Sequence, residues 1–296
     1  MQPDSRAPST VPGYGAGQVT KVPHWHGLVA WDLLFNSLST GLFLVAAFSE
    51  LAAPQVFASV AKLAYPVALV FLVADLVCLV LDLGDPLRFH HMLRVFKPSS
   101  PMSLGTWSLV VYSLPLTMAA ALSLVPDGGM VVDWVRRAAL VLGLLPALAS
   151  AAYKGVLLST NAQPGWKDAR WLGGYLTSSA LMLGSVEMLV LSVLMGQDRA
   201  VASMRTALGL LLVINTVPLV LLLVNLHPVL SRTHSRGHLW GAGSLMLGGG
   251  IVIPLVLLFM GNNPLPTLSA VALILLSHAA FRIQLIKIPT NFEPRP

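Results

Sequence analysis

The sequence predicts an all-α integral membrane protein with eight transmembrane helices. First, 55% of its 296 residues are hydrophobic, only 10% are charged, and the mean hydropathy is +0.76, which is typical of a chain that lies mostly in lipid. Second, eight apolar stretches are each long enough to cross a bilayer, which takes about 20 residues. Third, little sequence remains between them for an extramembrane domain. We favour two four-helix bundles, although no internal repeat supports this grouping.

The first half of the chain begins with a polar tail, residues 1–26, which is rich in Pro, Gly, Ser and Thr. The tail has no apolar core region, so we do not expect a cleavable signal peptide. The four spans that follow are predicted at 28–50, 60–81, 104–125 and 134–158. Gly84 and Pro86 end the second span, and Pro101 with Ser103 begins the third.

The second half contains spans predicted at 171–195, 204–226, 237–260 and 265–287, so the transmembrane domain covers 27–288 and 289–296 form a short tail. Glycine-rich runs at 241–243 and 248–250 suit close helix packing in lipid. Prolines interrupt several spans, which membrane helices tolerate when neighbouring groups satisfy the freed backbone.

An even number of spans places both termini on the same side of the membrane. Most of the 18 Lys and Arg residues fall in segments that we assign to that side. The bias predicts that both termini are cytoplasmic, and we expect the membrane to be the bacterial cytoplasmic (inner) membrane. A basic face that docks an acidic partner subunit would give the same bias. We therefore do not read the pI of about 9.8 as a sign of nucleic-acid binding.

Cysteine and histidine usage limits the possible cofactors. The single cysteine, Cys78, excludes a disulfide framework and cysteine-ligated zinc or iron–sulfur sites. Of the histidines, only His278 lies deep in a predicted span, so paired histidine ligands for a haem are not expected. We expect neither haem nor metal in this chain.

Two connecting segments carry specific motifs. They are Leu81-Asp82-Leu83-Gly84-Asp85-Pro86-Leu87-Arg88-Phe89, continuing through Pro101-Met102-Ser103 to Trp107, and Tyr153-Lys154-Gly155 followed by Trp166 and Asp168-Ala169-Arg170-Trp171. These motifs resemble the NrfD/PsrC family, the membrane subunits of polysulfide, nitrite and related molybdenum-dependent respiratory reductases. The similarity extends over roughly residues 24–195.

The resemblance implies an eight-helix subunit without haem that exchanges electrons between a membrane quinone, menaquinone or ubiquinone, and a peripheral iron–sulfur subunit. That partner would be a four-cluster ferredoxin-like protein on the terminal side, passing electrons to or from a molybdopterin catalytic subunit. The family's quinone-binding tyrosine corresponds to Tyr153, and its acidic or histidine position in the first helix to Asp32. Where some members have an asparagine, this chain has Leu28-Val29, and His26 is the alternative donor.

The chemistry of the residues agrees with this placement. Asp32, Asp75, Arg88 and Tyr153 all fall in the half of the bilayer nearest the terminal side. Quinone reduction takes up two protons with two electrons, so its site needs titratable groups and hydrogen-bond donors. The competing interpretations are an interhelical structural partner for Asp75, an ion pair with Asp82 for Arg88, and an interfacial aromatic anchor for Tyr153.

A second group of polar residues lies deeper. Glu187, His278 and Asn215 are near the middle of their spans, where an unpaired glutamate would have to be protonated. They are candidates for proton translocation across the membrane. Equally, Glu187 could be a neutral group that hydrogen-bonds Asn215 or His278.

Two other functions fit part of the pattern. A proton-coupled secondary transporter would also have intramembrane carboxylates and interrupted helices, but it would not explain the single elaborated face or the two motifs. A purely structural anchor without quinone chemistry is the third possibility.

Overall fold

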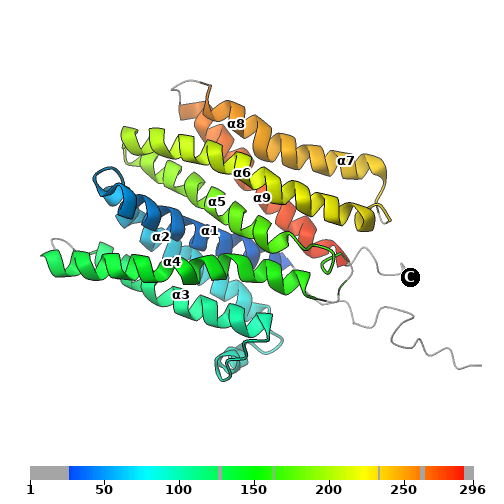
Figure 1. The fold of residues 1–296 in the computed structure, drawn as a ribbon, viewed down its shortest axis with the longest axis horizontal. Coiled ribbons are helices and arrows are strands. Elements are labelled where there is room, and N and C mark those ends of the chain that lie inside the picture. Colours follow the sequence, from blue (N-terminus) through cyan, green and yellow to red (C-terminus); the bar gives the residue numbers. More distant parts are fainter. Residues whose placement is uncertain are drawn as a thin grey trace, which may run out of the picture.

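A computed structural model describes residues 27–125, 129–161, 163, 165–232, 234–260 and 264–289. Within these residues every regular secondary-structure element is a helix (Figure 1). The elements are α1 (Gly27–Ala52), α2 (Pro54–Leu81), η1 (Pro86–Leu93), α3 (Pro101–Ser123), α4 (Gly129–Ser159), α5 (Leu172–Leu194), α6 (Asp198–Leu230), α7 (Arg236–Ser244), η2 (Leu245–Val252), α8 (Ile253–Leu258) and α9 (Pro264–Lys287).

Eight of the described helical segments are long and apolar enough to cross a membrane, which confirms the predicted fold class. The seventh span is continuous in space but changes helix type, because α7 passes through the π-helical turn η2 before α8. The beginning of α1 and the end of α9 lie at the same end of the bundle (Figure 1). We call this the terminal end. The fold is that of a multi-pass membrane protein.

Helix ends follow the local chemistry that the sequence indicates. Proline occupies the first turn of α2, η1 and α3, where a missing N–H costs nothing. At the start of α3, the Ser100 hydroxyl accepts a hydrogen bond from the Ser103 backbone N–H at 3.4 Å. Helix α2 therefore ends, and helix α3 begins, where the sequence predicted.

Helix α1 lies at the centre of the molecule and packs against α2, α4, α5 and α9. Figure 1 shows α1–α4 grouped on one side and α5–α9 on the other, with α1 and α5 at the seam. Gly41 of α1 and Gly184 of α5 let these two backbones touch, since a Cβ at Gly41 would lie 1.9 Å from the Ala180 carbonyl oxygen. Close approach of this kind drives helix association in lipid, where burial of apolar surface gives no advantage.

Large apolar side chains cover the outside of the bundle. Leu145, Phe48 and Leu210 are examples, with 76%, 70% and 63% of their surface exposed. The interior, in contrast, contains a series of polar side chains along α1, among them Asp32, Asn36 and Glu50. This inverted arrangement is expected of a protein whose solvent is lipid and whose polar groups must find partners inside.

Candidate functional site

A buried lysine joins two aspartates from different helices. The ammonium of Lys154 in α4 donates hydrogen bonds to Asp32 Oδ1 of α1 at 2.7 Å and to Asp75 Oδ1 of α2 at 2.5 Å. It also donates to the Asp32 carbonyl oxygen at 3.1 Å. All three side chains are buried, so this triad, Asp32–Lys154–Asp75, is a desolvated ion cluster that ties three helices together.

Neutral polar side chains next to the triad are hydrogen-bonded to it or to each other. The Asn36 amide, one turn after Asp32, donates to Asp75 Oδ2 at 3.3 Å and to the Ser150 hydroxyl at 3.1 Å. Both carboxylates are therefore hydrogen-bonded by protein groups in place of water, which a buried charge requires. If all three members of the triad are ionised, its net charge is −1, and it can take up one proton without losing the lysine bridge.

The triad lies close to the terminal end of the bundle. Asp32 follows the beginning of α1 by about 8 Å, Lys154 precedes the end of α4 by about 8 Å, and Asp75 precedes the end of α2 by about 9 Å, at about 1.5 Å per residue. The sequence predicted this depth for both aspartates. It did not predict the lysine between them.

Tyr153 lies beside the triad. Its ring packs against α3, where a Cβ at Gly105 would meet the ring Cδ2 at 2.0 Å, and its centroid is 5.7 Å from Lys154 Nζ. The half-buried side chain makes no hydrogen bond through its hydroxyl to any described residue. A phenol that is positioned by its ring and has an unused O–H can donate to a ligand.

A second buried cluster surrounds Arg282 of α9. Its guanidinium is fully buried and donates to the hydroxyls of Ser37 at 2.8 Å and Ser179 at 2.9 Å, and to the His278 carbonyl oxygen at 3.2 Å. His278 Nδ1 lies 3.0 Å from the Tyr175 hydroxyl. Arg282 thus joins α1, α5 and α9 through hydroxyl groups.

The predicted proton-path residues are not joined to each other. Asn215 accepts a hydrogen bond from the Ser178 hydroxyl at 2.7 Å, and His278 pairs with Tyr175. Both carboxyl oxygens of Glu187 are buried without a hydrogen-bond partner among the described residues. The structure therefore does not contain the alternative in which Glu187 bonds Asn215 or His278, because those two side chains pair with Ser178 and Tyr175 and Glu187 has no hydrogen-bond partner among the described residues.

A further candidate, Arg88, lies away from the triad. Arg88, in η1, is exposed and pairs with Asp85 Oδ2 at 2.9 Å rather than with Asp82 as the sequence suggested, since one 3-10 turn brings residues i and i+3 together. His26 lies outside the described residues.

Three basic residues that we counted toward the charge bias between the two sides of the membrane are buried inside the bundle. Lys154 and Arg282 belong to the clusters above, and Arg136 pairs with Glu50 at 2.7 Å at the opposite end of the bundle, where Tyr65 also donates to Glu50 at 2.7 Å. The signal for Lys154 was its place inside the apolar stretch 134–158, because an ionisable group in a span normally has a partner. Its position near the end of that stretch made it look like an interfacial cation.

Comparisons with known proteins bear on this arrangement. A family model described as polysulfide reductase, of the NrfD type, matches residues 11–287. A 109-residue segment is 28% identical to one of the selenate reductase subunits of Mesobacillus selenatarsenatis. That segment makes up 37% of this chain and spans only 25% of the relative's length.

Proposed function

The chain belongs to the NrfD-type polysulfide reductase family, and from that membership we propose that it is the quinone-reactive membrane subunit of a respiratory oxidoreductase complex. It exchanges electrons between menaquinone or ubiquinone in the bilayer and a peripheral iron–sulfur subunit at the terminal end. That subunit, a four-cluster ferredoxin-like protein, passes electrons to or from a molybdopterin catalytic subunit. The observation that carries the proposal is the triad beside Tyr153, near the terminal end of the bundle.

The triad supplies what quinone chemistry needs from a protein. A quinone takes up two electrons and two protons to become a quinol, and the reverse reaction releases them. Tyr153 donates a hydrogen bond from its hydroxyl to one quinone oxygen, which holds the headgroup in position. The Asp32 or Asp75 carboxylate exchanges one proton at a time, so two successive exchanges account for the two protons, and Lys154 keeps both carboxylates oriented while the charge of the cluster changes.

The Tyr153→Phe variant tests this assignment. Loss of one hydrogen bond worth about 1.4 kcal/mol lowers kcat/KM for quinol about tenfold, while dye-linked activity of the peripheral subunits is unchanged. Tyr175→Phe is the matched control, because it removes a phenol hydroxyl in the membrane at the Arg282 cluster instead. Quinol kinetics that are equal in wild type and Tyr153→Phe would contradict the role of Tyr153.

The partner is tested separately. The tagged chain, extracted from its native membrane in mild detergent, is expected to bring an iron–sulfur protein with it. A secondary transporter would be isolated without one, and quinone in the lipid extract of the pure protein would argue against a structural anchor. We favour the oxidoreductase over the transporter because the matched family is one of reductases.

Proton translocation is a further part of the prediction. Glu187 is buried without a partner among the described residues, so it is expected to be protonated at rest. If it takes part in translocation, Glu187→Gln retains quinol turnover but loses generation of a membrane potential in proteoliposomes. Turnover and potential that both equal those of the wild type would remove Glu187 from the path.

A further inference from the structure

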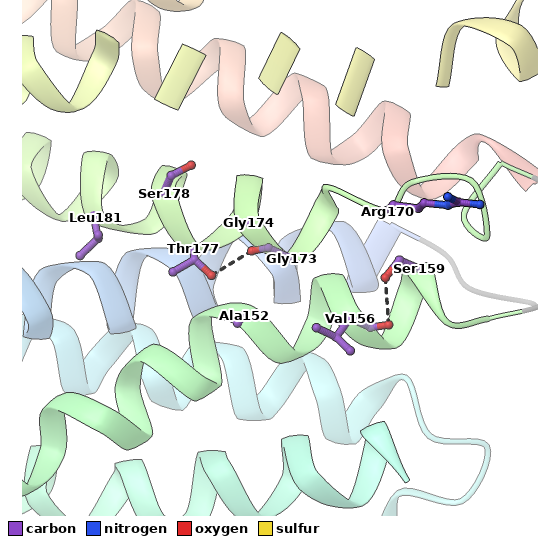
Figure 2. Close-up of a pocket in the computed structure, with 9 residues that line it drawn as sticks. All are labelled: Ala152, Val156, Ser159, Arg170, Gly173, Gly174, Thr177, Ser178 and Leu181. Carbon is purple, nitrogen blue, oxygen red and sulfur yellow. Dashed lines mark hydrogen bonds between the residues drawn. The ribbon is translucent and has the colours of Figure 1, made fainter. Parts of the chain in front are cut away.

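An elongated groove runs along the outside of the bundle between α4 and α5 (Figure 2). Its volume is about 530 Å³. It is lined on α4 by Ala152, Val156 and Ser159, and on α5 by residues from Gly173 to Leu181, a length of about 12 Å. Its lining faces away from the triad, because Lys154 points from the other side of α4 towards α1 and α2. We call it the α4–α5 groove.

Glycines create the groove. A Cβ at Gly155 would lie 2.5 Å from the Gly173 Cα, so these two helices touch through their backbones. Next to this contact, Gly174 is exposed, and a Cβ there would meet only the Trp171 ring, at 3.8 Å. The missing side chain at Gly174 leaves an open hollow beside a tight helix crossing.

The hydroxyl groups on the walls of the groove are not free to donate to a ligand. The Thr177 hydroxyl donates to the Gly173 carbonyl oxygen at 2.9 Å, and the Ser159 hydroxyl to that of Val156 at 3.2 Å (Figure 2). The Ser178 hydroxyl donates to Asn215 at 2.7 Å. Because these hydroxyls are already used, the groove presents an apolar surface, which suits a hydrocarbon chain better than a quinone headgroup.

The side chain of Arg170 lies at the terminal end of the groove. Arg170 is exposed, and its guanidinium makes no hydrogen bond or ion pair with any described residue. It lies just before the beginning of α5 (Figure 2), and a residue that directly precedes a membrane span is expected near the lipid headgroups. The same loop carries Lys167 and Asp168, so its net charge is positive.

We propose that the α4–α5 groove binds one anionic phospholipid, with an acyl chain along the groove and the headgroup phosphate on Arg170. An acyl chain supplies the apolar, flexible filling that a narrow groove of small residues accepts. Basic sites between membrane helices select anionic headgroups by charge. A lipid held there would fill the outer surface of the α4–α5 crossing without entering the triad.

Lipid binding to the full-length chain tests the proposal. The purified protein is delipidated in detergent and titrated with phosphatidylglycerol or phosphatidylcholine, and one-lipid adducts are counted by native mass spectrometry. Wild type is expected to prefer phosphatidylglycerol. Arg170→Gln weakens this binding about fivefold, which corresponds to about 1 kcal/mol for one basic residue near an anionic surface, and Gly174→Leu weakens binding of both lipids by filling the groove.

Matched controls come from the same chain. Arg232→Gln removes another exposed cation at the terminal end, and Gly241→Leu adds a side chain at an exposed glycine with nothing within 4 Å of its Cβ. Both should bind lipid as wild type does. If Arg170→Gln and Gly174→Leu bound lipid as wild type does, the proposal would be overturned. Displacement of phosphatidylglycerol by equimolar menaquinone would also overturn it, because the groove would then bind an isoprenoid tail.

Discussion

Replacing Lys154 by methionine should destabilise the bundle severely, because two aspartates would then face one another without a cation. The lysine donates to both carboxylates and to a backbone carbonyl oxygen, and all three side chains are buried. Removing one partner of a buried ion pair costs about 3–5 kcal/mol, mostly because the remaining charge loses its compensation. We expect Lys154→Met to lower the free energy of unfolding by that amount.

The same reasoning predicts a rescue. In the triple variant Asp32→Asn, Asp75→Asn, Lys154→Met the charges are removed together, so no uncompensated carboxylate is left. Replacing a whole buried ion cluster by neutral groups is often close to neutral in stability. The triple variant should therefore recover more than half of the stability that Lys154→Met loses, even though it carries three changes.

The assay is unfolding in mixed detergent micelles with increasing dodecyl sulfate, followed by circular dichroism. Lys62→Met is the control, because Lys62 is an exposed cation in α2 and its loss should change stability by less than about 0.5 kcal/mol. If Lys154→Met costs less than about 1 kcal/mol and the triple variant is less stable still, the aspartates are not held by the lysine charge and the triad is not an ion cluster.

Two other changes probe the packing. Gly41→Ala should lower the free energy of unfolding by about 1–3 kcal/mol, because its Cβ would collide with a backbone carbonyl of α5. Gly237→Ala should not lower it, because nothing lies within 4 Å of the added Cβ. If the two variants had the same thermal unfolding midpoint, the tight crossing of α1 and α5 would be contradicted. Arg136→Met should cost about 3–5 kcal/mol by leaving Glu50 unpaired, while Arg137→Met, at an exposed position, should unfold like wild type. Equal unfolding midpoints for those two variants would mean that the Glu50 pair contributes nothing.

Much of the fold was predictable because lipid imposes a simple rule on the chain. A span must be apolar over about 20 residues and must be helical, so composition and length give each helix and its depth. The predicted spans at 28–50 and 265–287 correspond to α1 (Gly27–Ala52) and α9 (Pro264–Lys287). The turn signals Gly84, Pro86 and Pro101 were equally local, and they ended and began helices as expected.

The candidate site was predicted only in part. The depth of Asp32 and Asp75 followed from counting residues along their spans, and Tyr153 from its resemblance to a family motif. The partner of the two aspartates did not follow, since Lys154 is 122 residues from one and 79 from the other. The partners of Arg282 did not follow either, because Ser37 and Ser179 belong to distant helices.

The sequence by itself therefore determined that this chain has eight helices long and apolar enough to cross a membrane, and where each ionisable residue lies along its helix. Only the tertiary structure decided which of these residues meet. Rotation of each helix about its own axis, and the choice of its neighbours, depend on close backbone crossings such as that of Gly41 with Gly184. In the assembled bundle Lys154 lies between Asp32 and Asp75, and Glu187 has no hydrogen-bond partner among the described residues.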